Sequence, residues 1–171
     1  FGTVYAGQQR DPERKVAIKV LRLGLDSPEE AREILARFAA EQQALALLNH
    51  PGIAKVFGSG VTEAGQPYFV MEFVDGLPIA TYCEQHRLDL TARLLLFQQA
   101  CEAVHHAHQR GLIHRDLSVN NVLVESHEGR PRAKVIDFGL VKSLTLKLTD
   151  KTLHSRRDRV MGTPESMSPE Q

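Results

Sequence analysis

The chain has 171 residues, of which 42% are apolar and 25% are charged, and these proportions are typical of a globular protein. Lysine plus arginine and aspartate plus glutamate both number 21, so no net charge directs the chain to nucleic acid or to an anionic membrane. No apolar run approaches the roughly 20 residues that span a bilayer, and the only cysteines, Cys83 and Cys101, have no metal-site spacing. These features argue against a membrane span and a disulfide framework.

The first third of the chain predicts a β-rich unit. Two β-branched runs, residues 1–6 and 16–21, flank a polar turn over residues 8–13 and predict a hairpin. Alternation along the second run places Lys19 on the same face as Ala17. The opposite face takes Val16, Ile18 and Val20. Lys19 is therefore either an edge side chain that reaches water or a paired cation.

A capping box that begins at Ser27 predicts a helix to about Leu48. Its apolar stripe consists of Ile34, Phe38, Leu45 and Leu48. Glu41 falls within this stripe, and a buried carboxylate without a partner is costly. We therefore expect Glu41 to pair with Lys19.

The middle of the chain predicts a second hairpin, formed by residues 53–61 and 68–74. Asp75-Gly76 then breaks the pattern, so a boundary between two units is expected near residues 73–77. A short helix is expected over residues 79–86, and a longer one from Thr91 to a stop at Gly111. The longer helix is predicted from the spacing of Leu94, Phe97, Cys101, Val104 and His108.

The last third predicts short strands at residues 112–113, 122–124 and 133–136, with a turn over residues 126–131. Residues 140–161 show no period and carry several hydroxyl side chains. The histidines near residue 106 lack a carboxylate or thiolate at ligand spacing, so no metal cluster is expected there.

Three oxygen-bearing side chains stand out beside the short strands. Asp116 lies in a turn, Asn121 precedes the run 122–124, and Asp137 follows the run 133–136. Oxygens of Asn121 and Asp137 at the ends of adjacent strands suit a hard cation such as Mg²⁺. Asp116 is then the group left to face a substrate hydroxyl.

Several short motifs occur along the chain in one order. They are Gly2-x-Val4, Val16-Ala17-Ile18-Lys19, His114-Arg115-Asp116, Asn121, Asp137-Phe138-Gly139, Gly162-Thr163-Pro164-Glu165 and Ser168-Pro169-Glu170. In these motifs the chain resembles the Ser/Thr protein kinases, most closely their bacterial, eukaryotic-like branch. The resemblance covers the whole chain and implies an α+β, two-lobed protein-kinase-like fold. Residues 1–74 would be the small lobe, β-rich with one long helix, and residues 75–171 the first part of a mainly helical large lobe.

The resemblance also implies roles for single residues. Asp116 would accept the proton of the substrate hydroxyl, and Lys19, braced by Glu41, would hold the α- and β-phosphates. Asn121 and Asp137 would hold Mg²⁺. The ATP-binding residues would be Gly2, Val4, Ala17, Lys19, Met71, Glu72, Val74 and Leu123, with Met71 as gatekeeper and Glu72 to Val74 as hinge. The regulatory residues would be Arg115, Phe138 and Thr163. An apolar stack would join Leu45, Val56, His114 and Phe138. Glu125 and Asp75 match no family position and are interpreted as surface residues.

The implied activity is phosphoryl transfer from ATP to Ser or Thr hydroxyls of a protein substrate, with ATP and Mg²⁺ as cofactors and a cytoplasmic location, either alone or as part of a membrane-anchored protein. No nucleic-acid partner and no membrane contact are expected from this segment, and the oligomeric state is left open. Because the chain lacks the family's first strand and last helices, we expect a piece of a longer protein that is nearly inactive alone.

Two departures from the family leave an alternative open. Ser118 stands where Ser/Thr kinases carry a lysine two residues after the catalytic aspartate, and Ser166 stands where the family has tyrosine. Both motivate a pseudokinase that binds nucleotide or a partner without transfer. The presence of Lys19, Asp116, Asn121 and Asp137 argues against it. A small-molecule kinase of the same fold is a third interpretation, but it would not need residues 162–170.

Overall fold

The computed structural model describes residues 2–21, 36, 45 and 48–138. The chain divides into two compact units, residues 1–49 with 54–74 and residues 50–53 with 75–171. Ala36 and Leu45 are helical, and Leu45 is buried. The rest of the helix predicted over residues 27–48, with Glu41, lies outside the described residues. So do residues 139–171, which include Thr163 and Ser166.

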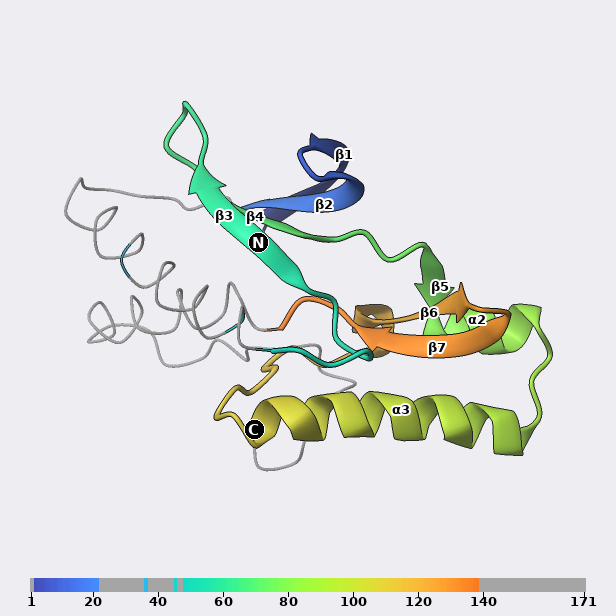
Figure 1. The fold of residues 1–171 in the computed structure, drawn as a ribbon. Helices are drawn as coiled ribbons and strands as arrows, with labels where there is room; N and C mark the ends of the chain where they lie inside the picture. Colours follow the sequence, from blue (N-terminus) through green and yellow to red (C-terminus); the bar gives the residue numbers. More distant parts are fainter. Residues whose placement is uncertain (1, 22–35, 37–44, 46–47, 139–171) are drawn as a thin grey trace, which may run out of the picture. The chain divides into compact units, whose positions relative to one another are not determined.

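The first unit contains a four-stranded antiparallel sheet in the order β1-β2-β4-β3 (Figure 1). Its strands are β1 (Gly2–Arg10), β2 (Glu13–Leu21), β3 (Val56–Val61) and β4 (Pro67–Glu72). Both predicted hairpins are confirmed. The first turn is shorter than the predicted residues 8–13, because β1 and β2 pair as far as Arg10 opposite Glu13. Four positions predicted as turn, Gln8, Gln9, Arg10 and Glu13, are paired strand residues whose polar side chains resemble those of a turn.

The two faces of this sheet differ as the alternation of β2 predicts. Val16, Ile18 and Val20 line one side of a shallow hollow of about 490 Å³. Ala17 lies directly opposite Met71 of β4, and Lys19 lies directly opposite Phe69. Since opposite residues in an antiparallel pair share a face, Ala17, Lys19 and Met71 lie on the side away from this hollow.

The second hairpin begins later than predicted. Strand β3 starts at Val56, whereas Ile53 belongs to the second unit and forms an isolated parallel bridge with Val135. An apolar run across residues 53–61 therefore serves two units, and apolar content alone does not reveal where one ends.

The second unit contains an antiparallel sheet in the order β5-β6-β7, with strands β5 (Gly76–Pro78), β6 (Val122–His127) and β7 (Arg130–Val135). Strand β5 was not predicted, because Asp75-Gly76 indicates a break. Gly76 instead allows close pairing, since a Cβ placed there would lie 2.6 Å from the carbonyl oxygen of Val124. The predicted turn over residues 126–131 contracts to Glu128 and Gly129, whose positive φ angles of 52° and 75° suit a two-residue hairpin turn.

Two helices complete the described part of this unit. Helix α2 (Ile79–Gln85) agrees with the short helix predicted over residues 79–86, and α3 (Leu90–His108) agrees with the long one. Asp89 caps α3 by accepting a hydrogen bond of 2.8 Å from the amide of Ala92. In the described part of the chain, no helix combines the length and apolar character that crossing a bilayer requires.

The buried face of α3 consists of Leu96, Ala100, Ala103 and Ala107. Figure 1 shows α3 running along the β6–β7 hairpin. The buried apolar residues on the hairpin are Val122, Val124, Ala133 and Val135. The row of larger residues that predicts the helix is mostly exposed, with Leu94 at 56% and Phe97 at 63%. Small side chains let the hairpin lie close to the helix, so periodicity located the helix correctly but did not identify its buried face.

The predicted strand at residues 112–113 is wrong. Among the described residues they pair with no strand. The amide of Leu112 donates to the carbonyl of Ala107 at the end of α3, and Ile113 is 61% exposed. Two apolar residues between a helix stop and a tight loop are too few to define a strand.

Candidate active site

His114 anchors the loop that leads from α3 to β6. Its side chain is only 2% exposed. Its Nε2 lies 2.9 Å from the carbonyl oxygen of Ile136, so this nitrogen carries the proton and donates. Its Nδ1 then accepts from the amide of Asp116 at 3.3 Å. One neutral imidazole therefore ties the Asp116 loop to the residue that precedes Asp137.

The hairpin brings Asn121 and Asp137 together although 16 positions separate them. Asn121 ends the short helix η1 (Val119–Asn121) directly before β6, and Asp137 follows β7 by two residues. Val122 lies opposite Val135, and the amide of Ile136 donates to the carbonyl of Asn121 at 2.9 Å. Both residues thus lie at the end of the hairpin away from its turn.

Asp116 is attached to the same end through Asn121. The Nδ2 atom of Asn121 donates to the carbonyl oxygen of Asp116 at 2.7 Å. Together with the hydrogen bond that the amide of Asp116 donates to His114, this fixes the main chain of Asp116 on both sides. The structure therefore brings the three predicted residues, Asp116, Asn121 and Asp137, to one end of one hairpin.

The side-chain oxygens at this end of the hairpin are suitable ligands for Mg²⁺. Because Asn121 donates through Nδ2, its Oδ1 is the acceptor that can face a cation, and Asp137 supplies carboxylate oxygens. Magnesium is commonly held by one or two such groups together with substrate phosphates. Among the described residues, no group of three or more His, Cys, Asp or Glu side chains could hold a metal ion.

Two residues of the site have unusual backbone conformations. Arg115 and Asp137 have φ angles of 59° and 61°, in the left-handed region that non-glycine residues seldom adopt. Such conformations persist where surrounding contacts enforce them, often at functional sites. Next to Asp137, Phe138 is 6% exposed, and its ring centroid lies 4.7 Å from that of His114. This contact joins two of the four residues predicted to form the apolar stack; Val56 and Leu45 belong to the other unit.

In the first unit, the sheet places four of the predicted nucleotide-binding residues on one face. Val4 lies opposite Lys19, and Ala17 lies opposite Met71. Val4, Ala17, Lys19 and Met71 therefore share the face away from the hollow lined by Val16, Ile18 and Val20. Gly2 lies opposite Leu21, where an added Cβ would collide with the carbonyl oxygen of Val20.

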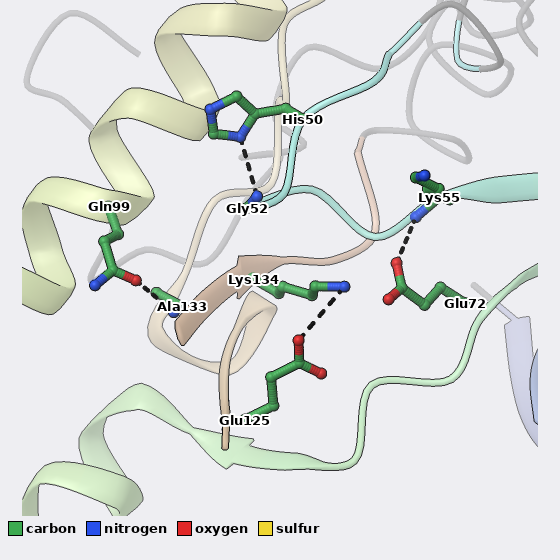
Figure 2. A network of polar contacts seen from close by, with 8 residues as sticks. All are labelled: His50, Gly52, Lys55, Glu72, Gln99, Glu125, Ala133 and Lys134. Carbon is green, nitrogen blue, oxygen red and sulfur yellow. Dashed lines mark hydrogen bonds and ion pairs between the residues drawn. The ribbon is translucent and has the colours of Figure 1, made fainter. Parts of the chain in front are cut away.

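The predicted hinge is partly engaged in the sheet. The amide of Glu72 donates to the carbonyl of Lys55 at 2.8 Å, and Glu72 Oε2 accepts from the amide of Lys55 at 3.1 Å (Figure 2). The amide of Glu72 is thus engaged by the carbonyl of Lys55. Val74 is buried at 8% exposure, and the chain passes to the second unit after it.

The interpretation of Glu125 as a surface residue is wrong. Its side chain is 16% exposed and lies 3.5 Å from the ammonium of Lys134, which is itself buried (Figure 2). Lys134 lies opposite Leu123, and Glu125 follows Leu123 by two positions, so all three share the face of the hairpin turned away from α3. The alternation of the hairpin could have revealed this pair. Asp75 is exposed, in agreement with its interpretation.

Removing one charge of this pair is expected to destabilise the protein, because the other stays buried. Glu125→Gln should lower the free energy of unfolding by about 1–3 kcal/mol, and Glu125→Leu combined with Lys134→Met should recover most of that loss. Urea unfolding of wild type, Glu125→Leu, Lys134→Met and the double variant measures the coupling energy between the two side chains. The exposed Glu84→Gln serves as the matched control and should change stability by less than about 0.5 kcal/mol. Equal effects of Glu125→Gln and Glu84→Gln would contradict the expectation.

Comparison with known families identifies the fold. A family model described as the protein kinase domain matches residues 1–171. The chain belongs to the protein kinase domain family. The α+β, protein-kinase-like fold and the resemblance to bacterial Ser/Thr kinases are thereby confirmed.

Individual relatives agree with this assignment. Serine/threonine-protein kinase Pkn1 of Myxococcus xanthus is 36% identical over 173 residues, which cover 100% of this chain and 24% of Pkn1. The DNA damage-responsive serine/threonine-protein kinase RqkA of Deinococcus radiodurans is 40% identical over 172 residues, which cover 98% of this chain and 24% of RqkA. The chain thus spans about a quarter of the length of these two kinases.

Solved structures give the same result for the fold. The kinase domain of Mycobacterium tuberculosis PknI superposes with a TM-score of 0.63 at 33% identity, over 82% of this chain and 54% of the PknI chain. The apo form of PpkA-294 superposes with a TM-score of 0.67 at 26% identity, over 90% of this chain and 59% of the other.

Proposed function

We propose that this kinase domain transfers the γ-phosphoryl group of ATP to Ser or Thr hydroxyls of a protein substrate. The observation that carries the proposal is the gathering of Asp116, Asn121 and Asp137 at one end of the β6–β7 hairpin. The names of the two relatives described above, both serine/threonine-protein kinases, support the choice of substrate class.

In this proposal Asp116 is the catalytic residue that meets the substrate. His114 and Asn121 hold its main chain in place, so the position from which its side chain extends is fixed. Its carboxylate would orient the substrate hydroxyl and accept its proton. Asn121 and Asp137 would hold Mg²⁺, which supplies charge neutralisation at the phosphates when bound. Leu123, two residues beyond Asn121, would lie beneath the adenine.

The first unit would supply the remaining nucleotide contacts. Lys19 shares a sheet face with Val4, Ala17 and Met71, which suits a cation that holds phosphates beside an apolar surface for the base. Glu41 would brace Lys19. The main chain from Glu72 to Val74 would pair with adenine, and Gly2 would belong to the loop over the phosphates.

Regulation would act through the segment that follows Asp137. Arg115, beside Asp116, would bind a phosphate through two parallel hydrogen bonds from its guanidinium group. Phe138 would couple this segment to the Asp116 loop through its ring contact with His114. Thr163 would contribute to the choice of Ser and Thr over Tyr. The cytoplasm, with its supply of ATP, is the proposed location of this domain.

Radiolabelled ATP offered to the full-length protein with Mg²⁺ and generic protein substrates tests the proposal. We expect label on serine and threonine and none on tyrosine in the hydrolysed product. Binding of Mg²⁺-ATP without any transfer would contradict the proposal and favour a pseudokinase instead.

A further inference from the structure

A tight turn of the second unit lies outside the catalytic loop. Residues 50–53 form it, and the amide of Ile53 donates to the carbonyl of His50 at 3.1 Å. The side chain of His50 closes the turn a second time, because its Nδ1 accepts from the amide of Gly52 at 3.0 Å (Figure 2). His50 must therefore be neutral, with its proton on Nε2, for the turn to keep this bond.

The turn is attached directly to the strand that leads to Asp137. The amide of Val135 donates to the carbonyl of Gly52 at 2.8 Å, and Ile53 bridges Val135 in parallel. The next residue, Ile136, is the one whose carbonyl accepts from His114. A change in the turn thus reaches Asp137 through two residues of main chain.

On its other side the turn packs against α3. A Cβ placed on Gly52 would lie 3.1 Å from the Cβ of Ala103, so the turn and the helix are in close contact. One helical turn further along α3, the ring centroid of His106 lies 4.9 Å from that of His50. The Nε2 atom of His106 is buried and has no hydrogen-bond partner among the described residues. The imidazole of His106 carries no negative charge that would stabilise a cationic His50, and it lowers the pKa of His50.

The charges around His50 favour its neutral form. Burial lowers the pKa of His50 below its ordinary value of 6.5; His106 and Arg110 lower it further, and Glu102 alone opposes them. The hollow of about 370 Å³ beside His50 is also lined, from the β6–β7 side, by His127, Glu128, Arg130 and Arg132. Three of these four side chains are basic or become so in acid.

We propose that neutral His50 is a positioning residue for the phosphoryl transfer proposed above, and that its protonation in acid loosens the turn that holds β7 and Asp137. The inference rests on that proposed function. A proton on Nδ1 would face the amide of Gly52, so two donors would meet where one hydrogen bond now lies. His50 thus makes the geometry at Asp137 depend on pH without touching substrate.

The sign of the effect follows from the direction of the shift. Because the fold lowers the pKa of His50, the stabilisation is present in full above pH 6.5 and is lost as the pH falls through the lower pKa of the folded state. Loss of one hydrogen bond corresponds to about fivefold in the population of the ordered turn.

The experiment compares pH profiles of kcat and KM for Mg²⁺-ATP between pH 5 and pH 8 in the full-length protein. His50→Asn keeps an acceptor for the amide of Gly52 but cannot titrate. His105→Asn is the matched control, because His105 is the exposed neighbour of His106 on α3. The ratio of kcat at pH 5 to kcat at pH 8 should be about fivefold higher in His50→Asn than in wild type or His105→Asn. Titration of ATP itself is common to all three and cancels.

A direct measurement covers the case in which His50→Asn fails to fold. Nitrogen NMR of labelled histidine in the wild type should show His50 protonated on Nε2 alone at pH 8 and titrating below pH 6.5. A proton on Nδ1 at pH 8, or superimposed pH profiles of His50→Asn and wild type, would overturn the inference. Absence of transfer at every pH would instead count against the proposed function, and the NMR result would still decide the state of His50.

Discussion

Asp116→Asn is expected to lower kcat for phosphoryl transfer by about 10²–10⁴-fold, the usual contribution of a positioned proton acceptor. The two hydrogen bonds that hold residue 116 use its main chain, the amide to His114 and the carbonyl from Asn121. Asparagine has the same main chain and nearly the same shape, so the loop should stay in place. The loss should therefore appear in the chemical step and not in folding.

Single-turnover transfer from radiolabelled ATP measures the effect. The affinity for Mg²⁺-ATP and the thermal midpoint of unfolding serve as controls and should match those of wild type. A loss of less than about tenfold would show that Asp116 is not the proton acceptor.

Ser118→Lys is expected to raise kcat, because the family's lysine at this position would lie near the phosphoryl group in transfer. One preorganised electrostatic contact is typically worth about 10²–10³-fold in rate, and the gain should be of that order. The backbone at this position permits the change. Ser118 precedes η1 without a side-chain cap, and its φ of −149° suits any residue. The amide of Asn121 donates to the main-chain carbonyl of residue 118, which the substitution keeps.

Ser118→Gln separates charge from side-chain length and should leave kcat within about twofold of wild type, because it adds no charge at the phosphate. Steady-state kinetics of all three proteins with one substrate make the comparison. Equal rates for the lysine and glutamine variants would show that the missing cation does not limit this kinase.

The sequence predicted the grouping of Asp116, Asn121 and Asp137, which we propose to be catalytic, more reliably than it predicted their surroundings. Asn121 and Asp137 each adjoin an apolar run, and hairpin pairing is the simplest way to bring two such runs together. Asp116 lies in a turn that Asn121 ties to the same end of the hairpin. The placement of Lys19 relative to Ala17 followed from strict alternation in β2. Both inferences depend on local pattern, which a single sequence carries.

The errors concern contacts that depend on a neighbouring element. The buried face of α3 consists of Leu96 and three alanines because the hairpin approaches closely, and the apolar pattern of the helix alone does not predict that approach. Strand β5 exists because Gly76 fits against Val124 of a strand almost fifty positions later in the chain. Glu125 is paired because Lys134 shares its face across the hairpin. The predictions for Glu41 and Thr163 lie outside the described residues.

The turn at Glu128 and Gly129 lies at the far tip of the hairpin, away from the end where Asn121 and Asp137 meet. The 16 positions that separate Asn121 from Asp137 in sequence therefore measure the length of strands β6 and β7 and not the distance between the two side chains. Lengthening both arms equally would carry the tip outward and leave the cation end as it is. A single residue added to one arm would instead either form a bulge or reverse the inside and outside of that strand. Natural variation in length at this tip is thus compatible with an unchanged arrangement of Asn121 and Asp137 at the other end of the hairpin.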